Sequence, residues 1–393
     1  MTGHSAEVAA LEVLTLRLRL RYGFAHARAE RRASSPLLVR LTLADGTVGY
    51  GEALPRTYVT GEDEGSVRAG LLGALAALVL GRPFPDLDAV SRWLADPEVA
   101  AARERAPAAL GALELALLDA AGRSSGRPVF DLLGPPRCEP ASDGVVVGFM
   151  PERLLDLFLE RVRASRPRVV KVKVGREDDL PRLERVRRAL GEEIDLRVDA
   201  NGAWSPEEAV RRVESFAPYR VSVVEQPVAG RDLEGLAQVA AEVEVPVMAD
   251  ESLTGLRDAL RLLELAPRVR WNLRVGKCGG LVSTLGLARL ARGRGVPAQL
   301  GVMVGESGLL AAAGRIAAAV HGEFEHVETA PGMLADDVVA QAASLRPAAA
   351  APGLGVDVCP HRVAALTVAA GEVRRTRVGA APRLPPSHDR HVA

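Results

Sequence analysis

The pattern of hydrophobic and polar positions divides the chain into two regions. The first carries strand patterns and then helical ones. Apolar and basic residues alternate as in a half-buried strand, a hairpin pattern with an Asp45-Gly46 turn follows, and helical apolar spacing comes next. These elements lie at 9–22, 36–55, 64–81 and 107–122. Strands followed by helices indicate a separate α+β domain at 1–135.

From about residue 143 the pattern becomes a repeated alternation of short β-rich runs and amphipathic helices, which is typical of βαβ units and a parallel sheet. Polar residues near the ends of successive runs recur every 25 to 27 residues, at Lys173, Asp199, Glu225, Asp250 and Lys277. A near-constant period predicts a closed barrel with its active site at the carboxyl ends of the strands. Continuing the period in both directions adds strands at 145–150, 299–307 and 324–331, which makes eight.

We therefore predict an α/β fold in which a (β/α)8-type (modified TIM) barrel occupies residues 136–355, after the α+β domain at 1–135. Residues 356–393 are expected to return to the first domain and to end in a disordered tail.

Composition and charge limit the class of protein. The 393 residues include 50 Lys and Arg and 50 Asp and Glu, so the formal net charge is zero. This balance argues against a partner that is a nucleic acid or a membrane surface. Apolar runs stay short of the ~18 residues that a membrane span needs. Three scattered cysteines and an N-terminus without the order of a signal peptide favour the cytoplasm.

The scarcity of lysine draws attention to the few lysines present as candidates for acid–base catalysis. Of the 50 basic residues only Lys171, Lys173 and Lys277 are lysine, and the other 47 are arginine. A bias toward GC-rich codons explains the scarcity but not the positions that remain lysine. A buried ammonium can lose its proton, whereas a guanidinium stays charged. Lys173 and Lys277 are therefore candidates for acid–base chemistry, while Lys171 either reaches a substrate carboxylate or is a buried lysine paired with an acid.

Three carboxylates end successive strands and should converge at the mouth of the barrel: Asp199, Glu225 and Asp250. Converging carboxylates repel one another, and a hard divalent cation removes that conflict. Oxygen ligands favour Mg²⁺, with Mn²⁺ as the alternative, over zinc. The competing interpretation is that Asp199 and Asp250 cap the helices that follow. With a metal ion bound, Lys173 and Lys277 should face each other across it.

These motifs resemble those of the enolase superfamily, in its muconate lactonizing enzyme subgroup. The segments that carry the resemblance are Lys171-Val172-Lys173, Asp199-Ala200-Asn201, Glu225-Gln226-Pro227, Asp250-Glu251-Ser252 and Lys277-Cys278-Gly279-Gly280, and the likeness extends through 49–62, 114–119 and 305–315. It therefore covers nearly the whole chain.

The resemblance implies a reaction and the residues that perform it. A substrate carboxylate would bind Mg²⁺, Lys173 would remove the α-proton on one face, and Lys277 would act as acid or base on the other, through an enediolate. Supporting residues would be Lys171, Asn201, Glu251 and Glu306, and substrate contacts would come from Tyr58, Ser307 and Thr329. Asn272 either orients the site or caps its strand. The resemblance also implies a capping role for the first domain and a homo-oligomer.

Two departures from related motifs narrow the reaction. No histidine occurs in 299–307, where mandelate racemase relatives and acid-sugar dehydratases use one. The Asp-x-Asp pair of the best-characterised dipeptide epimerases is replaced by the sequence Val-Glu-Thr-Ala-Pro at 327–331. We predict a racemase or epimerase of an amino-acid derivative. The alternatives are a muconate-type cycloisomerase, a syn-dehydratase similar to o-succinylbenzoate synthase, and a non-catalytic barrel that binds a small carboxylate.

Overall fold

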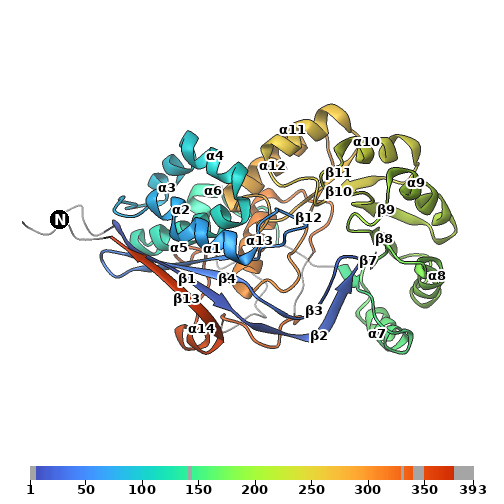
Figure 1. Cartoon of the computed structure of the whole chain (residues 1–393), viewed down its shortest axis with the longest axis horizontal. Helices are drawn as coiled ribbons and strands as arrows, with labels where there is room; N and C mark the ends of the chain where they lie inside the picture. The colour runs from blue at the N-terminus through green and yellow to red at the C-terminus, as the bar shows by residue number, and fades with distance from the viewer. Residues whose placement is uncertain (1–5, 140–143, 329–331, 340–348, 376–393) are drawn as a thin grey trace, which may run out of the picture.

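The computed structural model describes residues 6–139, 144–328, 332–339 and 349–375 (Figure 1). Its N-terminal part contains an antiparallel sheet in the order β13-β1-β4-β5. These strands are β13 (Thr367–Arg374), β1 (Val8–Leu16), β4 (Leu37–Leu43) and β5 (Val48–Ala53). The last strand of the described chain therefore completes the sheet that the first strand begins.

Helices cover one face of this sheet, and the long helix α5 (Pro107–Ser125) packs directly on β5 (Figure 1). The contact is close because β5 presents glycines to it. A Cβ at Gly51 would lie 1.9 Å from the carbonyl oxygen of Ala112, and one at Gly49 would lie 2.3 Å from that of Ala116. The other helices of this part are α1 (Glu64–Leu72), α2 (Ala74–Ala77), α3 (Leu87–Leu94), α4 (Pro97–Arg105) and α6 (Phe130–Leu133).

A separate two-stranded hairpin, β2 (Leu18–His26) and β3 (Ala29–Ser34), extends from the N-terminal part to the barrel (Figure 1). Its tip is attached to the barrel by hydrogen bonds. The Arg28 side chain donates to the carbonyl oxygens of Asn201, at 2.6 Å, and Gly202, at 2.8 Å. The hairpin thus brings residues of the N-terminal part to the ends of the barrel strands.

The second part is a curled parallel sheet of seven strands inside a ring of helices (Figure 1). The strands are β6 (Gly144–Val147), β7 (Val169–Lys173), β8 (Asp195–Asp199), β9 (Val221–Glu225), β10 (Val247–Ala249), β11 (Arg270–Leu273) and β12 (Ala298–Leu300). The helices are α7 (Glu152–Ser165), α8 (Asp179–Leu190), α9 (Pro206–Ser215), η1 (Ala217–Tyr219), α10 (Leu233–Glu242), α11 (Leu256–Leu265), α12 (Leu281–Gly293) and α13 (Gly308–His321), and α14 (Pro360–Leu366) precedes β13.

The predicted fold class, a modified barrel with a strand-rich N-terminal part, is confirmed, but the eighth predicted strand is not formed as expected. Among the described residues 324–328, Val327 alone forms a strand bridge, an isolated one to Leu300 of β12. Residues 329–331 lie outside the described part of the chain. No helix among the described residues has the length and apolar character that a bilayer crossing requires.

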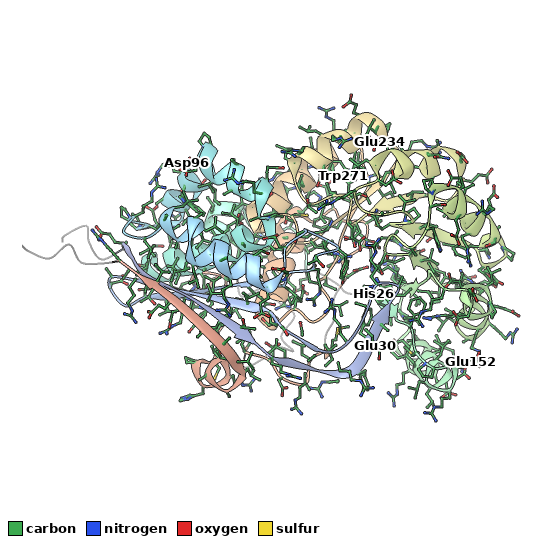
Figure 2. The ribbon with its side chains drawn as sticks, in the orientation of Figure 1. His26, Glu30, Asp96, Glu152, Glu234 and Trp271 are labelled. Atoms are coloured by element: carbon green, nitrogen blue, oxygen red, sulfur yellow. The ribbon has the colours of Figure 1, made fainter. Side chains whose placement is uncertain are left out.

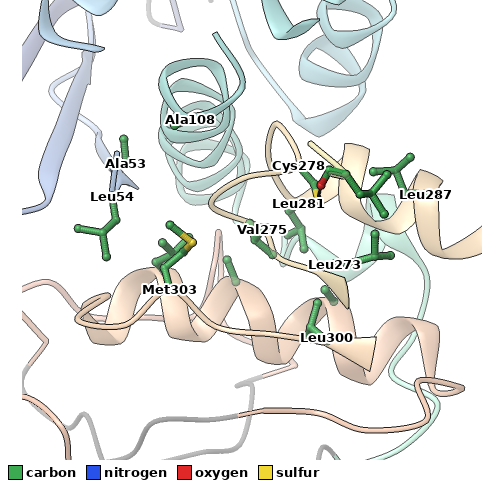
Figure 3. Close-up of a cluster of buried hydrophobic side chains, with 14 of the residues drawn as sticks. Ala53, Leu54, Ala108, Leu273, Val275, Cys278, Leu281, Leu287, Leu300 and Met303 are labelled. Atoms are coloured by element: carbon green, nitrogen blue, oxygen red, sulfur yellow. Dashed lines mark hydrogen bonds between the residues drawn. The ribbon is translucent and has the colours of Figure 1, made fainter. Parts of the chain in front are cut away.

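A buried apolar cluster joins the two parts near the mouth of the barrel (Figure 3). It includes Leu54 and Ala108 from the N-terminal part and Val275, Leu281 and Met303 from the barrel. Burial of such side chains provides about 25 cal/mol per Å² of apolar surface, so the N-terminal part is held firmly over the barrel.

Candidate active site

The three predicted metal ligands converge as expected. Strand register places Lys173, Asp199 and Glu225 side by side at the ends of β7, β8 and β9, and Asp250 follows β10 directly. One carboxylate oxygen from each of the three acids lies within 4.8 Å of the others. All three side chains are buried, and Asp250 Oδ1 has no hydrogen-bond partner among the described residues. Lys277 Nζ lies 3.3 Å from this oxygen and is its ion-pair partner. An oxygen-only set of three converging, buried carboxylates fits Mg²⁺.

The turn after β9 fixes the spacing between the acids. Gln226 has a positive φ of 39°, which turns its side chain back toward β10. Its Oε1 accepts hydrogen bonds from the backbone amides of Asp250, at 2.8 Å, and Ser252, at 3.0 Å. Asn272 Nδ2 donates to Glu225 Oε1 at 2.7 Å, so it orients that carboxylate. The metal-ligand set is therefore held by neighbouring amides.

Lys173 lies in the cavity beside the acids. Its Nζ donates to Asp199 Oδ2 and, at 3.0 Å, to Asn201 Oδ1. The Asn201 side-chain amide in turn donates to Glu251 Oε1 at 3.0 Å. These contacts fix the position of the Lys173 amine and place Asn201 and Glu251 beside it. The supporting roles of these two residues stay predictions.

Lys171 is a buried lysine paired with acids, which was one of its two predicted roles. Its Nζ forms ion pairs with Glu225, at 3.0 Å, and with Glu328. Burial opposes the charge, but Glu225, Glu328 and Asp199 outweigh that effect and hold the pKa of Lys171 above its ordinary value. Lys171 therefore stays charged. Glu328 lines the same cavity and was not identified from the sequence, although it lies within the 327–331 segment discussed there.

Lys277 does not lie where the sequence predicted. It follows the end of β11 by four residues, and its side chain is completely buried outside the cavity. Its Nζ donates to three backbone carbonyl oxygens, those of Asp250 at 2.6 Å, Leu253 at 2.6 Å and Asn272 at 2.8 Å. The expectation that Lys277 faces Lys173 across the metal is thus contradicted. The Lys277 amine instead donates hydrogen bonds to the backbone around Asp250.

Arg274 occupies the place expected for the second lysine. Its guanidinium donates to Asp250 Oδ2 and lies 3.5 Å from Glu225 Oε1, and it lines the cavity together with Lys173. Because β7 and the end of β11 lie on either side of β8, β9 and β10, Lys173 and Arg274 flank the three acids. Burial opposes the charge of Arg274, but Asp250 and Glu225 keep its pKa above the ordinary value. One arginine among 47 gave no signal in the sequence.

Side chains of the N-terminal part form one wall of the cavity. The hydroxyl of Tyr58 lies 3.2 Å from His26 Nε2, and both side chains line the cavity. The substrate contact of Tyr58 stays a prediction. Figure 2 shows His26 at the end of the hairpin nearest the barrel. Burial, together with the charges of Lys173, Arg31, Arg274 and Arg56, lowers the pKa of His26 to about 3, so its ring is neutral.

The remaining predicted residues lie elsewhere. Ser307 begins α13 as its N-cap, and its backbone amide and hydroxyl both donate to the carboxylate of Glu52 on β5. Glu306 accepts a hydrogen bond from the backbone amide of Met303 at 2.9 Å. Both residues border a neighbouring cavity beside α13 and not the one that contains Lys173. The substrate contact predicted for Ser307 stays a prediction, and Thr329 lies outside the described residues.

Comparison with known proteins agrees with this architecture. Residues 10–134 match the family described as mandelate racemase / muconate lactonizing enzyme, N-terminal domain, and residues 153–363 match the enolase C-terminal domain-like family. The hydrophobic dipeptide epimerase of Enterococcus faecalis is 31% identical over 79% of this chain and 86% of its own length. Muconate cycloisomerase 1 of Rhodococcus opacus is 30% identical over 69% of this chain and 73% of its own length. The crystal structure of N-succinyl Arg/Lys racemase from Bacillus cereus superposes with a TM-score of 0.84 at 26% identity, covering 94% of this chain and all of that one.

Proposed function

The chain belongs to the mandelate racemase / muconate lactonizing enzyme family, and we propose that it is a Mg²⁺-dependent isomerase that removes the proton α to a substrate carboxylate. The names of its relatives favour racemisation or epimerisation of an amino-acid derivative. The observation that carries the proposal is the position of the Lys173 amine beside three buried, converging carboxylates.

The chain's own residues would divide the work as follows. Asp199, Glu225 and Asp250 would hold Mg²⁺, which, when bound, stabilises the negative charge that develops on the substrate carboxylate. Lys173 accepts the α-proton at Nζ, and Asp199 and Asn201 keep that atom in position. His26 and Tyr58 line the same cavity from the side of the N-terminal part.

Loss of the Lys173 amine should remove the reaction and leave the fold intact. We expect Lys173→Met to slow exchange of the substrate α-hydrogen in D₂O by 10² to 10⁴-fold, as for removal of a general base. Lys173→Arg, which keeps the charge but not the base, should be equally impaired. NMR with a library of N-acyl amino acids and dipeptides measures the exchange, and wild-type rates in both variants would refute this role.

Removal of the metal should stop the same exchange. We expect EDTA to abolish it and added Mg²⁺ to restore it, because the three acids then regain their cation. Mg²⁺ should also raise the thermal unfolding temperature of the wild type but not of Asp250→Asn. Full activity in metal-free protein, or an equal thermal shift in the variant, would contradict the metal site.

A second candidate function is favoured by Arg274. A guanidinium remains protonated in proteins, so Arg274 itself cannot accept a proton from the face of the substrate toward it. Proton removal from one face suits cycloisomerisation or syn-elimination, whereas a racemase needs proton transfer on both faces. In D₂O, an N-acylglycine should therefore exchange one of its two α-hydrogens on this enzyme. Exchange of both at comparable rates would support the racemase instead.

Several further properties stay predictions from the sequence. These are assembly as a homo-oligomer, a cytoplasmic location, the use of Mn²⁺ in place of Mg²⁺, and the domain boundaries after residues 135 and 355.

A further inference from the structure

A hydrogen-bonded pair of side chains crosses the interior of the barrel below the three acids. Arg197 of β8 donates from its guanidinium to Gln299 Oε1 of β12, at 3.1 Å, and both side chains are buried. The strands β9, β10 and β11 separate β8 from β12 in the curled sheet, so the contact runs across the barrel and not along its wall. Arg197 precedes Asp199 on the same strand and lies one side-chain layer deeper.

Arg197 decides which way the Gln299 amide points. A guanidinium has only donors, so the oxygen of the amide has to face Arg197 and its NH₂ group has to face the other way. That NH₂ group lies 3.3 Å from Glu225 Oε2 and 3.5 Å from Glu328 Oε1. The reverse orientation would turn the amide oxygen toward two carboxylates and the NH₂ group toward a cation. Arg197 thus keeps a hydrogen-bond donor directed at the acids.

Both ends of this pair are held in place. At the start of β8, Asp195 Oδ2 accepts from Nε and Nη2 of Arg197, at 3.1 Å and 2.9 Å. At the other end, the Lys171 amine donates to the same oxygen of Glu225 as Gln299 does, at 3.0 Å. A continuous set of hydrogen bonds therefore connects the start of β8 to the carboxylate at the end of β9.

We propose that Arg197 and Gln299 are positioning residues of the metal site, which orient Glu225 and thereby set the affinity of the three acids for Mg²⁺. Carboxylates that bind metals are oriented by hydrogen bonds from groups that do not touch the ion, and loss of such a group weakens metal binding. Gln299 provides such a hydrogen bond, and Arg197 acts through Gln299. The inference rests on the proposed function only for the ion that the acids bind.

The test is the affinity of the full chain for Mg²⁺, measured by isothermal titration calorimetry. Gln299→Met keeps an unbranched side chain but removes the donor, so we expect it to weaken Mg²⁺ binding by roughly 10- to 100-fold. Arg197→Met should weaken binding by a smaller factor, because the Gln299 amide can then point either way. Because Arg197 acts through Gln299, the double variant should bind Mg²⁺ no more weakly than Gln299→Met alone.

Two controls separate this role from a general loss of stability. Arg187 is also buried, but it donates to backbone carbonyl oxygens, among them those of Tyr219, at 3.0 Å, and Gly191, at 2.9 Å. Arg187→Met should therefore lower the stability in urea and keep the Mg²⁺ affinity of the wild type. Gln238→Met, which removes an exposed hydrogen bond to Glu242, should change neither.

A conservative variant adds a test that does not depend on Gln299→Met. Arg197→Lys retains a donor toward the Gln299 oxygen and should bind Mg²⁺ more tightly than Arg197→Met does. Circular dichroism verifies that each variant is folded.

The outcomes distinguish this inference from the proposed function. Unchanged Mg²⁺ affinity in Gln299→Met, additive losses in the double variant, or an equal loss in Arg187→Met would overturn the positioning role. Equal binding by the wild type and all variants would refute only this role. A wild type that binds no Mg²⁺ would refute the metal site and this inference together.

Discussion

At the scale of single residues, the unexpected feature is the exchange of roles between Lys277 and Arg274. The lysine has the chemistry of a base but is enclosed by three carbonyl oxygens, and the arginine has no such chemistry but lies in the cavity. A side chain can act on a substrate only if it both lies in the cavity and has the required chemistry, and each of these two residues meets one of the two conditions. Lys277 therefore belongs to the framework that holds Asp250.

Lys277→Met should destabilise the protein. The substitution removes one hydrogen-bond donor from each of three carbonyl oxygens and removes the cation 3.3 Å from Asp250 Oδ1, so we expect the free energy of unfolding to fall by about 3 kcal/mol. Urea denaturation measures this change. Arg220→Met, which removes an exposed pair with Glu192, is the control and should change it by less than about 1 kcal/mol. A stable but inactive Lys277→Met would restore the catalytic interpretation.

The sequence was sufficient to predict that three acids and Lys173 lie together, but it did not predict that Arg274 lines the same cavity. Asp199, Glu225 and Lys173 end their strands, so a regular period finds them. The same period selected Lys277, because it counts residues and does not show that β11 ends at Leu273 and that the chain then turns. Arg31, Arg56 and Glu328 come from different parts of the chain, and only the folded structure brings them to one cavity.

At the scale of elements, the start of α13 shows how a helix cap can also connect two parts of the chain. Ser307 caps the helix by accepting a hydrogen bond from the Leu309 amide at 3.2 Å, while its hydroxyl donates to Glu52 of β5. A residue for which the family resemblance implied a substrate contact thus has a structural role in this fold. Periodicity predicted the helix, but it could not show which acid the cap would meet.

Ser307→Ala should weaken the fold without removing proton exchange. The helix loses its cap and buried Glu52 loses a donor, so we expect a loss of about 2 kcal/mol in unfolding free energy. Ser205→Ala removes the exposed N-cap of α9, which contacts no buried acid, and should cost about 1 kcal/mol. Chemical denaturation compares the two variants. Loss of exchange in a fully stable Ser307→Ala would instead support the substrate contact.

At the scale of the whole molecule, buried acids of the N-terminal part accept hydrogen bonds from helix starts of the barrel. Glu52 binds the start of α13, and Glu114 of α5 accepts from the Val282 amide of α12 at 2.8 Å. Burial raises the pKa of each of these two carboxyl groups to about 7. The junction between the two parts is therefore sensitive to pH.

The free energy of unfolding should fall as the pH rises from 4.5 to about 7. In the unfolded chain both carboxyl groups ionise near pH 4.5, whereas in the folded protein they keep their protons until about pH 7. Their contribution is complete below pH 4.5 and is lost as the pH passes 7, at about 3 kcal/mol for each group. Urea denaturation at pH 5 and pH 8 measures the loss. The double variant Glu52→Gln and Glu114→Gln should show a flatter profile, and an unchanged slope would contradict the assignment.

The pairing of β1 with β13 sets an order of events during synthesis. β1 is the first described strand to leave the ribosome, and its neighbour β13 follows roughly 350 residues later. Until then one edge of β1 lacks its partner, although β4 and the whole barrel are already available. An unpaired strand edge can pair with strands of other chains. A nascent or prematurely terminated chain therefore exposes an aggregation-prone edge until β13 pairs with β1.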